Sequence, residues 1–128
     1  MIKVYVTKQT NYPVSTPNIK KDIRKFLVNR GIVSDAELSI AIIGKNRMMD
    51  LAKKYLNEKE SVHNVLSFTE NEINEKFVYP PGVIQLGEVV ICYPKAFEEA
   101  KVENKRIEEK ILELIRHGTL HLLGIHHE

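Results

Sequence analysis

The segment ENKRIEEKILELIRHGTLHLL, residues 103–123, decides the fold class because it is the clearest amphipathic helix in the chain. Its apolar residues recur at intervals of three and four, which places them on one side of a helix. The predicted buried face consists of Ile107, Ile111, Leu114, Ile115, Gly118 and Leu122. Gly124 is a natural helix stop. A helix with a single apolar face has to pack against another layer of structure.

The segments upstream supply that layer as strands. Alternating or continuous apolar patterns predict strands at residues 1–7, 36–43, 64–69 and 83–93. Shorter helices are predicted at residues 16–30, where Ser15 or Thr16 can act as the cap, and at 46–56 and 94–101. Residues 70–82 are polar and contain Pro80-Pro81-Gly82, which predicts a loop. The order β-α-β-α-β-β-α-α predicts an α+β fold, a mixed α/β sandwich with about four strands and helices packed on the sheet.

Composition predicts one cytoplasmic domain spanning residues 1–128. The 128 residues are 43% hydrophobic and 28% charged, as in ordinary globular proteins. No window approaches the roughly 18 apolar residues of a membrane span, and the N-terminus resembles a strand rather than a signal peptide. Cys92 is the only cysteine, which excludes an internal disulfide and a cysteine-based zinc knuckle, and we expect it to be inert core. A net charge of +2 does not by itself indicate nucleic-acid binding.

Histidines at the end of the chain predict a metal site on the C-terminal helix. His117 and His121 are four residues apart, so they lie one turn apart on the same side of the helix. Gly124 then allows the chain to turn back, and His127 can complete a set of three nitrogen ligands. The spacing His-x3-His-x5-His, with a glycine after the second histidine, matches the zinc pattern of metzincins. His126 competes with His127 as third ligand, and we favour His127 on spacing.

Three histidines leave a fourth position for water, which is the arrangement of catalytic zinc. We therefore expect one zinc ion per chain, although nickel also suits three imidazoles. In zinc proteases the residue after the first histidine is a glutamate that serves as general base, but here it is Gly118. Peptide hydrolysis is less favoured for that reason, whereas attack on a phosphodiester is compatible with the metal alone. A structural histidine cluster or a solvated tail is the simpler alternative.

A family resemblance rests on the same residues. The stretch HGTLHLLGIHH closely resembles the H-G-x-L-H-L-x-G-Y-D-H signature of the YbeY family, which comprises bacterial rRNA maturation factors described as metal-dependent endoribonucleases specific for single strands. HNVLSF, from His63, is similar to the family's T-D-V-L-S-F, and LGEVVI, from Leu86, is similar to its L-G-D-I-V-I.

The resemblance implies an α/β sandwich with zinc held by His117, His121 and His127. It implies action on the 3′ end of small-subunit (16S) rRNA and a part in ribosome quality control. The implied partners are rRNA, the small ribosomal subunit and ribosomal or assembly proteins, with no membrane and no DNA. The chain departs from the family at Ile125 and His126, where the family has Tyr-Asp, and it lacks the family's arginine before the V-L-S-F strand. It also ends one residue after His127, so we expect no C-terminal extension.

The sequence gives only weak signals for catalytic residues other than the histidines. Glu88 is the one carboxylate that we would name as a proton acceptor or as a partner of a metal ligand, and a structural strand residue is its simpler interpretation. Asn64 and Ser67 can bond substrate or pair at the sheet edge, and His63 is expected to be an ordinary polar residue near the site.

RNA binding requires positive charge. If the first two helices cover the same side of the sheet, their cations would make a basic approach to the metal. These cations are Lys20, Lys21, Arg24, Lys25, Lys45, Arg47, Lys53 and Lys54. Two other functions stay open: a metal-dependent hydrolase of peptides or small phosphoesters, and a non-catalytic ribosome-assembly factor that holds zinc structurally.

Overall fold

The computed structural model of the protein describes residues 1–58, 61–69 and 82–124. Almost all of the predicted loop at 70–82 lies outside the described residues. The order of the elements is the predicted one. They are β1 (Ile2–Lys8), α1 (Thr16–Asn29), β2 (Ala36–Ile43), α2 (Lys45–Leu56), β3 (Val65–Phe68), β4 (Ile84–Cys92), α4 (Tyr93–Val102) and α5 (Ile107–Leu122).

The four strands form one mixed sheet in the order β1-β2-β4-β3. β1, β2 and β4 are parallel, whereas β3 is antiparallel to β4 and forms one edge. The register between β2 and β4 shifts at Glu37/Leu38, opposite Gly87. Gly87 has φ +126°, a backbone conformation that favours glycine, and an added Cβ would lie 2.2 Å from the Phe68 carbonyl oxygen. The absence of a side chain at Gly87 therefore lets β3 and β4 approach closely.

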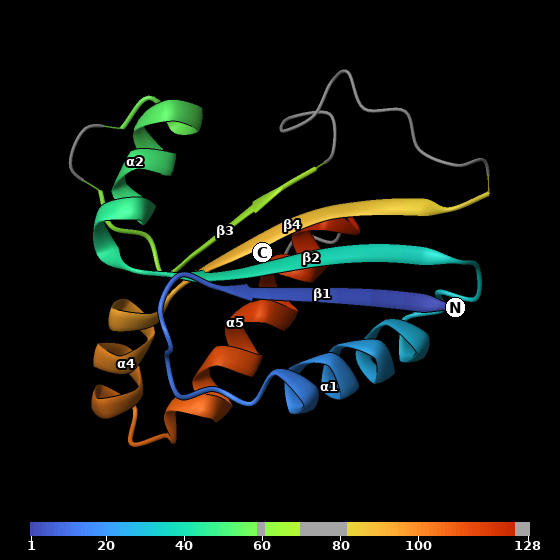
Figure 1. The fold of residues 1–128 in the computed structure, drawn as a ribbon, viewed down its shortest axis with the longest axis horizontal. Coiled ribbons are helices and arrows are strands. Elements are labelled where there is room, and N and C mark those ends of the chain that lie inside the picture. Colours follow the sequence, from blue (N-terminus) through green and yellow to red (C-terminus); the bar gives the residue numbers. More distant parts are fainter. Residues whose placement is uncertain (59–60, 70–81, 125–128) are drawn as a thin grey trace.

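Helices cover both faces of the sheet (Figure 1). α1 and α5 pack with one face in the main core, which includes Ile23, Leu38 and Ile115. α2 packs on the opposite face in a second core, where Met48 lies among residues of β3 and β4, including Phe68. The mixed α/β architecture predicted from the sequence is confirmed. α1 and α2, the two helices whose cations were considered for RNA binding, lie on opposite faces, however, so the condition for one shared basic approach is not met.

The ends of the helices follow from local chemistry. Ser15 caps α1, as predicted, because its Oγ accepts a hydrogen bond of 3.3 Å from the Asn18 backbone N–H. The last helix begins at Ile107 rather than at residue 103. Asn104 has φ +57°, which ends the preceding helix, and the Lys105 N–H then bonds back to the Ala100 carbonyl. Residues 103–106 therefore form the turn between α4 and α5.

A buried lysine joins α4, α5 and the start of β3. Lys110 on α5 is only 7% exposed, and its ammonium donates hydrogen bonds of 3.1 and 2.8 Å to the Glu103 carboxylate. Glu113 lies 3.2 Å from the same Nζ and Glu99 3.6 Å. Glu99 in turn accepts a bond of 3.0 Å from the Asn64 amide, directly before β3. Burial alone would lower the pKa of Lys110, but the bonds to its carboxylates outweigh burial and raise it.

Membrane insertion has no candidate among the described helices, since none combines the length and the apolar character that a membrane span requires.

Candidate metal and RNA-cleavage site

Two imidazoles converge on the exposed side of α5. His117 and His121 lie one turn apart, their Nε2 atoms are 3.1 Å apart, and their rings are nearly perpendicular, at 74°. The helix is held in place by its apolar side chains, among them Ile111 and Ile115, which are buried in the main core. The predicted geometry of the pair, two side chains on the same side of one helix, is therefore present.

The pair fits a metal ion by distance and by donor type. Two nitrogens bound to one zinc at about 2.05 Å and at the tetrahedral angle are separated by about 3.3 Å. The separation of 3.1 Å between the Nε2 atoms is close to that value. The same separation also suits a hydrogen bond between one protonated and one unprotonated imidazole nitrogen. Imidazole nitrogen is a preferred zinc ligand, so these residues can hold the ion that the spacing predicts.

The predicted third ligand, His127, and its competitor, His126, lie outside the described residues, as does Ile125. Within the described part of the chain, no group of three or more histidine, cysteine or carboxylate side chains is placed so that it could hold a metal ion. The ligand set of three histidines therefore stays a prediction, of which the structure brings two members together.

Gly118 allows the histidine helix to lie directly on the sheet. A Cβ at this position would lie 2.8 Å from Cγ1 of Val89 on β4 and 3.2 Å from Cγ2 of Val65 on β3. Real Cβ atoms essentially never approach other atoms as closely as 2.8 Å, so even an alanine would force a shift. The sequence showed that the zinc-protease glutamate is missing here. The structure adds the reason: position 118 faces the sheet and has no room for a carboxylate.

Glu88 is separated from the histidine pair by the sheet. Successive strand residues point to opposite faces. Val89 packs in the core beneath α5, whereas Val90, which shares the face of Glu88, packs in the core beneath α2. Glu88 and Arg47 help to line a cavity of about 470 Å³ on that second face. Burial raises the pKa of the Glu88 carboxyl, and the positive charge of Arg47 partly opposes this effect.

Two of the other polar candidates make structural contacts, and the third lies on the same side of the sheet as the histidines. Asn64 is bonded to Glu99, and His63 forms a 2.6 Å contact between its Nε2 and the Glu58 carboxylate in the connection between α2 and β3. Ser67 shares the α5 side of β3 with Val65, because the two residues are two apart on the strand. Of these candidates, Ser67 is therefore the one that the fold places on the histidine side of the sheet.

The predicted cations have several different surroundings. Lys45 forms an ion pair of 2.8 Å with Glu98, and the Arg24 Nε donates a bond of 3.2 Å to the Ile2 carbonyl. Arg116, next to His117, makes a two-bond contact with Asp22 of α1, at 3.0 and 2.8 Å. Sequence reasoning missed this pair, because nothing in the pattern indicates that the two helices are neighbours.

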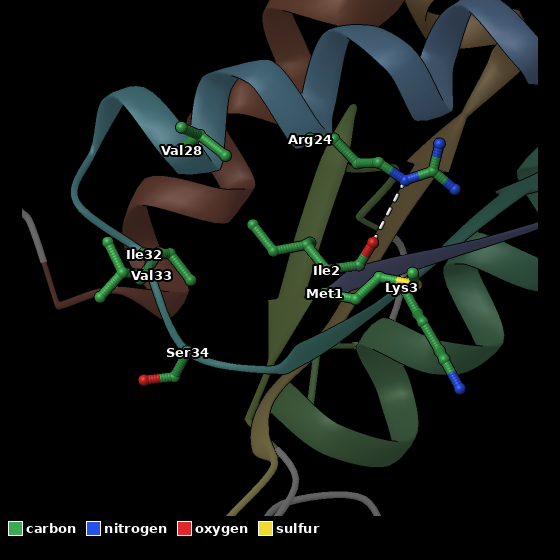
Figure 2. A pocket seen from close by; sticks show the side chains of 8 residues that line it. All are labelled: Met1, Ile2, Lys3, Arg24, Val28, Ile32, Val33 and Ser34. Atoms are coloured by element: carbon green, nitrogen blue, oxygen red, sulfur yellow. Dashed lines mark hydrogen bonds between the residues drawn. The ribbon is translucent and has the colours of Figure 1, made fainter.

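A second cavity, of about 690 Å³, lies at the start of β1 and the end of α1 (Figure 2). Figure 2 shows Val28 and Arg24 on α1, with Ile32 and Val33 on the connection that leads to β2. Its eight lining residues include neither a histidine nor a carboxylate. Its lining therefore lacks the imidazole and carboxylate ligands of the predicted metal chemistry.

The fold and the histidine helix define the class of protein by comparison. The solution structure of TM1509 from Thermotoga maritima matches with a TM-score of 0.63, over 98% of this chain and 75% of that one, at 22% sequence identity. At that identity the match establishes the fold.

Sequence comparisons establish the family. The model of the family "Endoribonuclease YbeY" matches residues 5–128. A protein named Endoribonuclease YbeY from Dehalococcoides mccartyi is 38% identical, over 99% of this chain and 78% of its own length. Proteins of the same name from Acinetobacter baumannii and Macrococcus caseolyticus are 36% and 31% identical, over 86% and 87% of this chain and 68% and 71% of their own lengths. The chain belongs to the YbeY endoribonuclease family, and the resemblance inferred from its motifs is confirmed.

Proposed function

We propose that this protein is a zinc-dependent endoribonuclease that cuts single-stranded RNA during maturation of the 3′ end of 16S rRNA. Membership of the YbeY family supports the nuclease activity. The observation that carries the metal dependence is the 3.1 Å approach of the His117 and His121 Nε2 atoms. The proposed partner is the small ribosomal subunit in the cytoplasm, with ribosomal or assembly proteins around the cleavage site.

His117 and His121, with His127 as the predicted third ligand, hold the zinc ion in this proposal. When bound, zinc polarises a phosphoryl oxygen and makes water a better nucleophile at neutral pH. α5 holds the two imidazoles in place. The buried residues of the helix pack in the main core, and Gly118 lets the helix lie directly on β3 and β4. A rigid helix of this kind holds ligands more accurately than a loop does.

Peptide hydrolysis has less support than RNA cleavage. The zinc-protease mechanism requires a glutamate directly after the first histidine. Position 118 points at Val89 and Val65 instead, and Glu88 lies on the other face of the sheet. Cleavage of a phosphodiester does not require that glutamate, because a metal ion alone can assist attack by an RNA 2′-hydroxyl or by water.

The test compares cleavage of single-stranded and double-stranded RNA by zinc-loaded wild type, His121→Ala and His63→Ala. His63→Ala is the matched control, because it removes an imidazole that pairs with Glu58 away from the histidine helix. We expect cleavage of the single strand by wild type and His63→Ala, and none by His121→Ala. A zinc-loaded wild type that leaves every RNA intact would refute the proposal.

A further inference from the structure

The outer edge of β3 presents backbone groups that no other described residue pairs with. The Cys92 N–H donates a 3.0 Å bond to the Asn64 carbonyl, which fixes the pairing phase of the two strands. Leu66 and Phe68, two and four residues later, therefore direct their backbone groups toward β4. Val65 and Ser67 direct their N–H and C=O groups away from the sheet, where no described residue bonds to them. Such an edge is a ready site for a partner with matching donors and acceptors.

The histidine pair lies on the side of α5 that borders this edge. Lys110 reaches Glu99, which holds Asn64 directly before β3, so this side of the helix faces the edge strand. His117 and His121 follow Lys110 by seven and eleven residues, about two and three turns, and therefore share its side of α5. Figure 1 shows β3 at one edge of the sheet and the last turns of α5 behind β4, and an added Cβ at Gly118, between the two histidines, would lie 3.2 Å from Val65 Cγ2 on β3.

We propose that the outer edge of β3 binds the Watson–Crick edge of an unpaired RNA base beside the histidine pair. This inference rests on the proposed function and names the part of the substrate that the site recognises. An extended residue presents its N–H and C=O side by side. The Watson–Crick edge of uracil offers a matching acceptor and donor, O4 and N3–H. Ser67, with both groups directed outward, is the residue that pairs with this base.

A base fits the strand edge better than a phosphate does. A phosphate oxygen could accept from the Ser67 N–H, but the outward carbonyls of Val65 and Ser67 would repel it, because a phosphate offers acceptors only. A base supplies both a donor and an acceptor, so both outward groups of Ser67 are satisfied. A base already paired in a duplex has no free Watson–Crick edge. The strand edge therefore selects single-stranded RNA.

An extended peptide could also pair with an exposed strand edge. The absence of a glutamate at position 118 and the membership of the YbeY family favour RNA as the occupant.

Proline substitution tests the edge without disturbing the sheet. Ser67→Pro removes one outward N–H and fills its place with ring carbons, while the bonds of Leu66 and Phe68 to β4 remain, and edge strands tolerate proline at such positions. Ser67→Ala is the matched control, because it removes the hydroxyl and keeps the N–H.

The assay measures binding of two fluorescent RNAs of about eight nucleotides, within the range of single-strand binding sites. One is oligouridine, and the other is oligo(N3-methyluridine), in which a methyl group blocks the Watson–Crick edge. We expect wild type and Ser67→Ala to bind oligouridine about tenfold more tightly than oligo(N3-methyluridine). A tenfold ratio corresponds to the free energy of one good hydrogen bond. Ser67→Pro should bind both RNAs equally weakly.

Equal binding of both RNAs by wild type would overturn the inference, and this comparison needs no variant to fold. So would a Ser67→Ala defect as large as that of Ser67→Pro, since the hydroxyl would then be the contact. Binding of an extended peptide that Ser67→Pro abolishes while RNA binding persists would also overturn it. A wild type that prefers unmethylated RNA but cleaves none would support the edge contact and refute the proposed function.

Discussion

Replacing Gly118 by alanine has two opposing effects on the free energy of unfolding: it improves helix propensity and it crowds the core. Gly118 lies in the middle of α5, where alanine is favoured over glycine by about 1 kcal/mol. The new methyl group would lie 2.8 and 3.4 Å from the two γ carbons of Val89, which is fully buried. Val89 is β-branched, so it has few alternative rotamers with which to move aside.

Overpacking a core by one methyl group costs about 1–3 kcal/mol. After subtracting the gain of about 1 kcal/mol in helix propensity, we expect Gly118→Ala to destabilise the protein by about 1 kcal/mol, and by at most about 2. A loss of 1 kcal/mol corresponds to a Tm lower by about 4 °C for a chain of this size. Urea titration and thermal melting both measure the effect.

A second background isolates the contact. Val89→Ala removes the two Val89 contacts and leaves Val65 Cγ2, at 3.2 Å, as the remaining tight contact, so Gly118→Ala should stabilise that variant by less than about 1 kcal/mol through helix propensity. The sign of the effect of Gly118→Ala is therefore expected to reverse between the two backgrounds. The same change in stability in both backgrounds, or a stabilised single variant, would show that α5 does not lie on the sheet as closely as described.

Three further substitutions test the electrostatics of the fold. Lys110→Met should lower the free energy of unfolding at pH 7 by about 2 kcal/mol, because it removes buried charged hydrogen bonds. The Lys110 ammonium lowers the pKa of the Glu103 carboxyl. The stability that this pair contributes is therefore fully present above the ordinary pKa of the carboxyl and disappears as pH falls through the lowered pKa. If urea titrations showed that Lys110→Met is destabilised by the same amount down to pH 2, this explanation would be contradicted. Burial raises the pKa of the Glu88 carboxyl, so its ionisation lowers the stability of the folded protein as pH rises. Glutamine stays neutral at every pH. In melting experiments Glu88→Gln should therefore be more stable than wild type at pH 7 and equally stable below about pH 4. Asp22→Asn should cost about 0.5–1 kcal/mol, since its pair with Arg116 is partly exposed, and high salt should shrink the difference.

Local patterns were sufficient to predict most of the fold. The run AELSIAII predicts a strand that the structure reproduces at Ala36–Ile43, because apolar residues alternate with Glu37 and Ser39 before Gly44 interrupts the pattern. Ser15 marks the start of α1 because a hydroxyl can accept from an unpaired N–H of the first turn. The spacing of His117 and His121 fixes their shared side of α5 for the same local reason.

Features that depend on distant contacts were not predictable from one sequence. An apolar stripe says that a helix packs, but not on which face, so the placement of α1 and α2 on opposite faces could not be read from their patterns. Lys110 resembles a surface residue in the sequence, and its burial follows from carboxylates on a neighbouring helix. Glu88 stands in a recognisable motif, yet the phase of β4 directs it away from α5. The turn at residues 103–106 was missed because Asn104 looks compatible with the amphipathic run around it.

The most direct test of the metal site is the zinc content of protein purified without an affinity tag or chelator. Wild type, His117→Ala, His127→Ala and the control His63→Ala would be compared, with a thermal melt of each to confirm folding. The account predicts about one zinc ion per chain in wild type and in His63→Ala, and loss of zinc from both other variants, which remain folded. Metal-free wild type, or zinc retained in His117→Ala, would contradict it.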